Sequence, residues 1–135
     1  MEVVRIDHSK ALPPEHPEWF EGTVHLQPLH EASAAGDVRL SAVFFAAGAR
    51  TLPHAHGTTQ VLHVVAGEGV VATEARKQVV RPGDVVVIPA HTWHWHGATP
   101  EATMCHISER PVGPPDDWDC PLLDWDTYMD GAEGT

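Results

Sequence analysis

The chain has 135 residues, of which 42% are hydrophobic, and its formal net charge at pH 7 is −11. This length fits one domain, 1–135, and the apolar fraction is too high for a disordered chain. Eight Lys and Arg against nineteen Asp and Glu give an acidic surface, which repels phosphate backbones and anionic lipid. We therefore expect small-molecule chemistry, with neither nucleic acid nor a membrane as partner.

The order of local patterns along the chain predicts an all-β fold. Residues 1–20 contain three prolines and no clear periodicity, so they predict an N-terminal arm. From residue 23 on, short runs rich in β-branched residues are separated by Gly, Pro and Asp, as in strands joined by turns. The runs predict strands at 23–29, 38–45, 60–67, 69–75, 85–89 and 102–108. Many short strands at this spacing indicate a sandwich or a barrel.

The last twenty residues are acidic and have room for one short helix. We expect their apolar side chains to dock on the barrel or on a second subunit, the alternative being a solvated tail; these side chains are Trp118, Leu122, Leu123, Trp125 and Tyr128. A homodimer is expected because Val38, Leu40, Ala42 and Phe44 form an apolar face opposite the predicted interior.

We expect the protein to be cytoplasmic. No window is apolar enough for a secretory signal or a membrane span. Cys105 and Cys120 fit no CxxC pattern and are read as reduced thiols.

Histidine is the unusual residue of this composition: there are eleven, seven of them between His54 and His106. His54 and His56 are two apart, so on a strand both side chains point to one face. Alone, such a pair is more often a surface accident than a metal site. His94 and His96 repeat the spacing on a later segment, and closing a barrel brings distant segments together.

Two longer patterns frame these histidines. Residues 48–67 read G-x5-H-x-H-x3-Q-x6-G, and residues 83–94 read G-x5-P-x4-H. Within residues 39–108, both strings resemble the signature motifs of the cupin superfamily in order, spacing and separation. The resemblance implies the cupin conserved β-barrel, of the double-stranded β-helix or jelly-roll type. It also implies one divalent metal ion inside the barrel, on His54, His56, Gln60 and His94.

The chain departs from the cupin pattern at two positions. Gln60 stands where the first motif usually has Glu; a neutral amide leaves the ion its full charge, which favours a stronger Lewis acid. It also removes the carboxylate of a two-His-one-carboxylate iron site. His91 stands where the second motif usually has Gly, so we expect a turn with positive φ, which His tolerates better than most residues.

The chain is further similar to small bacterial cupins with hydroxynitrile lyase activity, in the stretches EWFEGTV, GART, PGDVV, HWHGATP and MCHI. This likeness implies manganese or a similar divalent ion; iron, zinc, nickel and cobalt also suit the donors. It implies His106 as the pocket base with His96 close by, and a cavity lined by Ser41, Val43, Phe45 and Thr51.

Strand alternation bears independently on three of the remaining histidines. It turns His96 to the same interior as His94 and points His106 inward, whereas His63 faces out. An inward histidine near a Lewis acid can move a proton. The alternative for His106 is a core histidine that is hydrogen-bonded to the outer shell of the metal.

The leading hypothesis is a metal-dependent lyase acting at a carbonyl or hydroxyl carbon, cleaving or making cyanohydrins. One alternative is a mononuclear iron or nickel cupin dioxygenase; three-His sites support oxygen chemistry in this superfamily, so Gln60 does not exclude it. The other is a non-catalytic cupin that binds a metal or a ligand. The fold does not decide among them.

Overall fold

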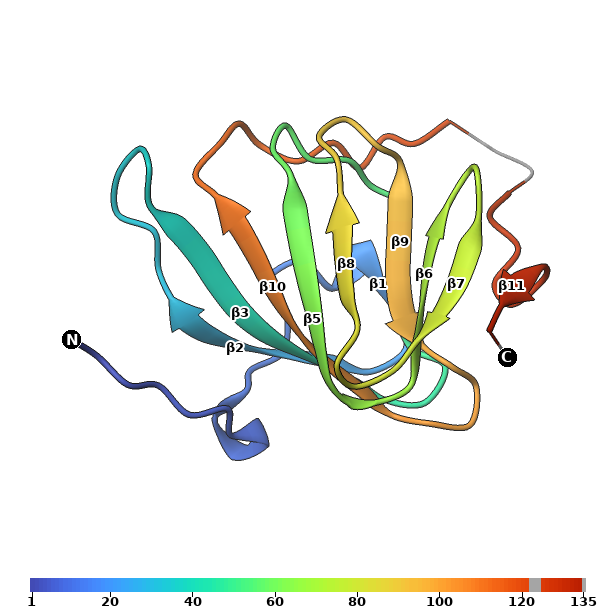
Figure 1. Ribbon diagram of the computed structural model, residues 1–135, viewed down its shortest axis with the longest axis horizontal. Coiled ribbons are helices and arrows are strands. Elements are labelled where there is room, and N and C mark those ends of the chain that lie inside the picture. Colours follow the sequence, from blue (N-terminus) through green and yellow to red (C-terminus); the bar gives the residue numbers. More distant parts are fainter. Residues whose placement is uncertain (122–124, 135) are drawn as a thin grey trace.

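The computed structural model describes residues 1–121 and 125–134, which form two facing sheets (Figure 1). The six-stranded sheet has the order β1 (Phe20–Glu21), β4 (Arg50–Thr51), β9 (His94–Ala98), β6 (Gly69–Thr73), β7 (Lys77–Val80) and β11 (Ala132–Glu133). The five-stranded sheet has the order β2 (Val24–His30), β3 (Val38–Phe45), β10 (Met104–Pro111), β5 (Gln60–Gly67) and β8 (Val85–Ile88). The described helical segments are two 3-10 turns, η1 (His8–Lys10) and η2 (Pro17–Trp19). The expected all-β fold is confirmed.

The six runs predicted as strands correspond to β2, β3, β5, β6, β8 and β10. The sequence pattern did not predict two strands of four or more residues, β7 and β9. β9 has the sequence HWHGA and contains no β-branched residue, and β7 begins with the polar pair Lys77 and Gln78. Both form because they pair with β6 on its two sides.

The main core lies between the two sheets and follows the alternation of the strands. On β3, the odd-numbered Val43 and Phe45 face inward and are at most 5% exposed. They meet Leu62 and Val64 of β5 and Val71 of β6 in one apolar cluster. Leaving water stabilises each such side chain by about 1.5–3 kcal/mol. The inward faces of β3, β5, β9 and β10 therefore line one interior.

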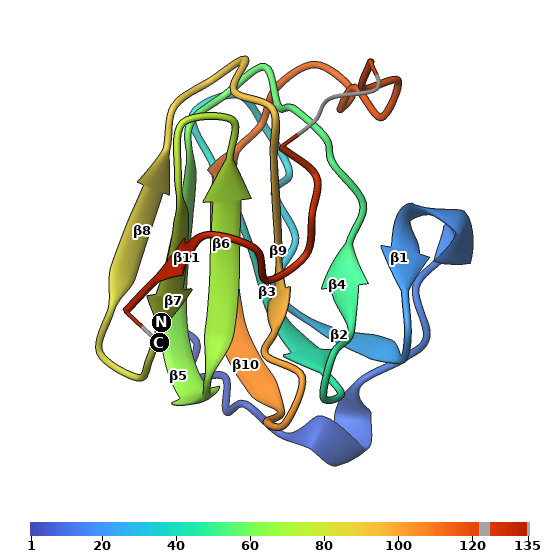
Figure 2. The ribbon, with the colours of Figure 1, turned by 90° about the vertical axis from the view of Figure 1, so that its right-hand side faces the viewer.

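The C-terminal segment docks on the outer face of the six-stranded sheet (Figure 2). Trp125 and Tyr128 pack against a second cluster that contains Trp95, and the Tyr128 hydroxyl donates to the Ala98 carbonyl. The described part of this segment forms β11, parallel to β7, and no helix. Leu122 and Leu123, also expected to dock, lie outside the described residues.

The N-terminal arm covers part of the outer face of β2 and β3. Phe44 stacks on His8, with 4.4 Å between ring centroids, and Ala42 is fully buried. On β2, Gln27 accepts from the Asp7 amide and donates to the Arg5 carbonyl. The apolar face expected to receive a second copy is thus shared with the protein's own arm. Among the described residues, no helix has the length and apolar character to cross a membrane.

Candidate metal centre and cavity

The backbone brings His54 and His94 together at one end of the two sheets. The two residues form an antiparallel bridge: the His54 amide donates to the His94 carbonyl (2.9 Å) and the His94 amide donates back (3.0 Å). The His91 amide donates to the His56 carbonyl at 2.7 Å. His91 has φ 63°, the positive value expected at this turn. The turn before β9 therefore holds both ends of the H-x-H segment.

Four polar side chains converge inside this frame. One ring nitrogen each of His54, His56 and His94 lies within 4.8 Å of the others, and all three side chains are buried. Gln60, at the start of β5, places Oε1 3.0 Å from Nε2 of His56 and 3.1 Å from Nε2 of His94. The Gln60 amide nitrogen donates to the Ser108 hydroxyl at 2.8 Å, which turns the amide oxygen toward the imidazoles.

The Nδ1 atom of each of the three imidazoles faces a hydrogen-bond acceptor, and these contacts bear on which ring nitrogen carries the hydrogen. Nδ1 of His54 lies 2.8 Å from the Leu52 carbonyl, and Nδ1 of His94 lies 2.8 Å from the Thr92 carbonyl. Nδ1 of His56 lies 2.7 Å from an oxygen of Asp116. A carbonyl only accepts, so Nδ1 of His54 and Nδ1 of His94 carry the hydrogen, and their Nε2 atoms keep a lone pair. Nδ1 of His56 also lies 2.7 Å from Nη1 of Arg110, which only donates, so the contacts of His56 are compatible with either tautomer.

The site therefore brings two acceptors together without a donor between them. The Nε2 lone pair of His94 faces Gln60 Oε1 at 3.1 Å, and neither atom carries a proton. A cation relieves such an arrangement, and three imidazoles with an amide oxygen suit a divalent first-row metal. The donor set fits the ion expected from the sequence.

The surroundings keep the imidazoles of His54 and His94 neutral. Burial lowers the pKa of His94 to about 4. Burial, with the neighbouring His94 and His56, lowers the pKa of His54 well below its ordinary value. Neutral imidazole is the form that binds a metal.

A second histidine pair lies beside the first cluster. Nε2 of His106 is 2.9 Å from Nδ1 of His96, and both side chains are at most 4% exposed. Burial lowers the pKa of His106 to about 4, and burial with the nearby His106 lowers the pKa of His96 well below the ordinary value. Within the described residues, Nε2 of His96 has no hydrogen-bond partner. This pair is neutral at pH 7 and can accept a proton.

A cavity of about 330 Å³ opens onto both histidine groups. Its wall includes His54, His56, Gln60 and His96, together with Ser41, Val43 and Thr51. The Thr51 hydroxyl also accepts from the His96 amide at 3.2 Å. Phe45, expected in the same wall, lies deeper: it packs against His96 and His106, with ring centroids 6.0 and 5.3 Å away. Phe45 therefore packs against the histidine pair from the core and does not line the cavity.

The cavity mouth is built from both ends of the chain, which the sequence patterns did not indicate. The N-terminal arm lines the cavity together with Asp116 and Trp118 from the chain after β10, and Trp19 of the arm stacks on Trp118. Arg110 of β10 is the register partner of Arg39 of β3, and both line the cavity. The arm residues are Leu12, Pro13, Pro14, Glu15, His16, Trp19 and Phe20. Trp19 and Phe20 fall in the stretch EWFEGTV noted in the sequence, but no spacing pattern placed any of these residues at the cavity.

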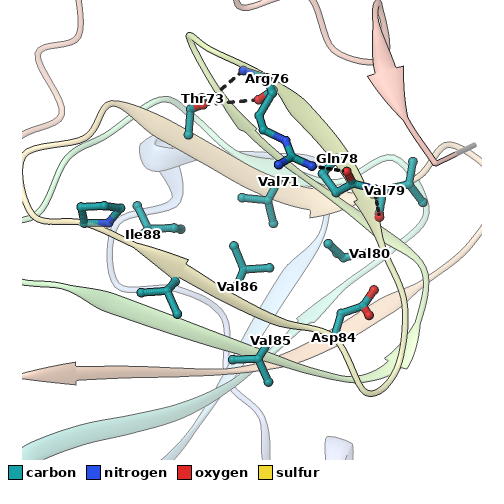
Figure 3. Close-up of a pocket in the computed structure, with 12 residues that line it drawn as sticks. Val71, Thr73, Arg76, Gln78, Val79, Val80, Asp84, Val85, Val86 and Ile88 are labelled. Carbon is teal, nitrogen blue, oxygen red and sulfur yellow. Dashed lines mark hydrogen bonds between the residues drawn. The ribbon is translucent and has the colours of Figure 1, made fainter.

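A larger cavity, of about 460 Å³, lies between the β6–β7 hairpin and β8 (Figure 3). Its floor is apolar, and no histidine is among the described residues that line it. Its charged groups are engaged locally: Arg76 donates to Gln78, and Asp84 accepts from the Arg81 amide. It offers neither a set of metal donors nor a group for proton transfer near neutral pH.

Two facing, largely antiparallel sheets with a His-rich cluster between them are the arrangement of a cupin. A family model described as a cupin domain matches residues 42–108, and the chain belongs to the cupin family. It is 40% identical over 121 residues to a (R)-mandelonitrile lyase of Granulicella tundricola, covering 87% of this chain and 92% of that protein.

Solved structures agree on the fold. A cupin-like protein of Thermotoga maritima is 29% identical, with a TM-score of 0.73 over 87% of this chain and 91% of that one. The polyketide cyclase RemF of Streptomyces resistomycificus is 18% identical, with a TM-score of 0.73 over 91% of this chain and 89% of that one. At that identity the second likeness shows the fold alone.

Proposed function

We propose that this protein is a metal-dependent lyase that cleaves or forms cyanohydrins, with one divalent ion held by His54, His56, Gln60 and His94. The observation that carries the proposal is the meeting of two groups in one cavity: four acceptor atoms suited to a cation, and a neutral histidine pair. The 40% identity to a mandelonitrile lyase supports the choice of reaction. We propose manganese, and the donors also accept iron, zinc, nickel or cobalt.

When bound, the ion supplies a Lewis acid for the oxygen of the substrate. The histidine pair supplies the base. If Nδ1 of His96 donates to Nε2 of His106, Nε2 of His96 keeps its lone pair and is the nitrogen left for a substrate hydroxyl. His106 then orients His96 and stabilises its protonated form, as the third member of a triad orients its base. Catalysis uses both rings as one unit.

The cleavage balances with these groups. The hydroxyl O–H bond breaks and its proton goes to His96, while the C–O bond becomes a carbonyl. The bond to the nitrile carbon breaks with its electron pair on cyanide, which takes the proton from His96 and leaves as hydrogen cyanide. Val43, Leu26 and Phe20 give the cavity an apolar side for the rest of the substrate. Synthesis is the same sequence reversed.

The test is release of benzaldehyde from mandelonitrile by the metal-loaded protein in oxygen-free buffer. We expect turnover above the uncatalysed background, and none from His54→Ala, which loses a ligand. Absence of turnover with several aromatic and aliphatic cyanohydrins would refute the lyase. Oxygen consumption by iron-loaded protein would instead favour the dioxygenase, which the three imidazole donors also suit. Stoichiometric metal without turnover in either assay would favour a non-catalytic cupin.

A further inference from the structure

The chain that follows β10 runs alongside the H-x-H segment, at the upper end of the two sheets in Figure 1. Ala55 and Asp117 form an antiparallel bridge with two backbone hydrogen bonds, both of 2.9 Å. The approach is close: a Cβ on Gly57 would lie 2.3 Å from Pro114 Cγ, so only glycine fits there. Residues 113–118 are therefore packed on the proposed ligand segment.

Antiparallel pairing at Ala55 and Asp117 sets their neighbours opposite each other. In such a ladder, residues on either side of a bridged pair face one another across the strands. Asp116 thus stands opposite His56, and Trp118 opposite His54. Both contacts are observed: Asp116 Oδ1 is 2.7 Å from His56 Nδ1, and Trp118 stacks on the His54 ring with centroids 4.2 Å apart. The pattern D-x-W is the cross-strand complement of H-x-H.

The Asp116 carboxylate differs from the groups behind the other two histidines. His54 and His94 each meet a neutral backbone carbonyl, whereas His56 meets a full negative charge. The side chain of Asp116 is 19% exposed, and Arg110 Nη1 donates to it at 2.6 Å, which fixes its position. Arg110 Nη1 also lies 2.7 Å from His56 Nδ1. In the tautomer that would ligate a metal through Nε2, Nδ1 is a donor, and the carboxylate accepts from both nitrogens.

The four proposed ligands themselves carry no negative charge, because Gln60 stands where a carboxylate is usual. A carboxylate that accepts from the distal nitrogen of a ligating histidine fixes its tautomer and raises the basicity of the other nitrogen. We propose that Asp116 is a positioning residue of the metal centre: it accepts from Nδ1 of His56, and so orients the ring and raises the basicity of the Nε2 atom that faces the other ligands. This inference rests on the proposed metal ligation.

The test compares Asp116→Asn with Asp117→Asn. Asparagine keeps the shape of aspartate and removes its charge. Asp117 is the matched control, since it is the next residue, is exposed, and within residues 1–121 and 125–134 its carboxylate accepts a side-chain hydrogen bond from the Asp119 amide alone. The measurement is the Kd of the metal-free proteins for Mn²⁺, by calorimetry and by the electron paramagnetic resonance of free Mn²⁺. We expect Asp116→Asn to bind about 10–100-fold more weakly, and Asp117→Asn to match the wild type within about twofold.

A further variant and an unfolding measurement separate positioning from a structural role. Asp116→Glu, which restores the charge, should recover part of the affinity. The metal-free Asp116→Asn protein loses the ion pair with Arg110 and should unfold at a lower temperature than the metal-free wild type, so each Kd is measured well below the unfolding midpoint of the variant. Equal affinity in Asp116→Asn and the wild type would overturn the inference and leave the proposed function standing. A wild type that binds no metal would overturn both.

Discussion

Replacing His96 or His106 with Leu should stop turnover and leave the metal in place. Neither ring is among the four proposed ligands, and the two rings are joined by one hydrogen bond of 2.9 Å. A positioned general base contributes about 10²–10⁴-fold to a rate, which corresponds to about 3–5.5 kcal/mol of transition-state stabilisation. Each single variant should lose a factor in this range.

The double variant shows whether the two rings act as a unit. Independent contributions would multiply, so His96→Leu/His106→Leu would lose about 10⁴–10⁸-fold. We expect a loss no larger than that of the worse single variant, because His106 acts on the substrate only through His96. The assay is kcat/KM for benzaldehyde release from mandelonitrile, with the metal content of each preparation measured alongside.

The lower stability expected of the variants limits the temperature at which their turnover can be compared. Each single variant leaves one buried nitrogen of the pair without its partner, at a cost of about 1–3 kcal/mol. Turnover is therefore measured well below the unfolding midpoint of each variant. Multiplicative losses, or a single variant that keeps more than a tenth of the wild-type kcat/KM with full metal occupancy, would refute the catalytic pair.

Three other predictions concern the metal, acid and assembly. His54→Ala, His56→Ala and His94→Ala should each abolish stoichiometric metal binding in elemental analysis, while Gln60→Ala should weaken it less because water can replace a neutral oxygen; full occupancy in two of the three histidine variants would contradict the ligand set. For the metal-free protein, the pKa of His106 falls from 6.5 in the unfolded chain to about 4, so between these values the unfolded state binds more protons than the folded state. Acidification from pH 6.5 to 4 should therefore lower the free energy of unfolding by about 3 kcal/mol through this residue alone. Urea denaturation of the wild type and of His106→Leu measures the difference, and an equal loss of unfolding free energy in the two proteins would contradict the prediction. Light scattering at micromolar concentration should give the mass of a homodimer, and the mass of a monomer would refute this prediction.

The sequence could predict the interior of the fold because the interior obeys alternation. His54, His56 and Gln60 follow one spacing, and the pairing of β9 with β6 turns His94 and His96 to the same side. The turn at His91 was also predictable, since the usual glycine at this position of the motif suggests a turn with positive φ, which histidine tolerates better than most residues. His63 also lies outward as expected, 3.2 Å from Glu109.

The cavity mouth could not be predicted, because it is assembled from contacts between segments far apart in the sequence. Asp116 is sixty residues from His56, and no periodicity relates the two. Trp19 and Trp118 stack with ring centroids 4.5 Å apart and join the two ends of the chain over the site. The sequence indicated that Trp118 would dock somewhere; the backbone bridge at Ala55 determines where. Long-range pairing of irregular segments leaves no local signature.

We propose that one divalent ion on these four side chains is required for turnover. The most direct measurement titrates the metal-free protein with Mn²⁺ in oxygen-free buffer, recording bound metal and benzaldehyde release in the same samples. Turnover should rise linearly with bound Mn²⁺ and level off at one ion per chain. Turnover by the metal-free protein at the rate of the loaded one, or a plateau of bound metal with no turnover at any point, would contradict it.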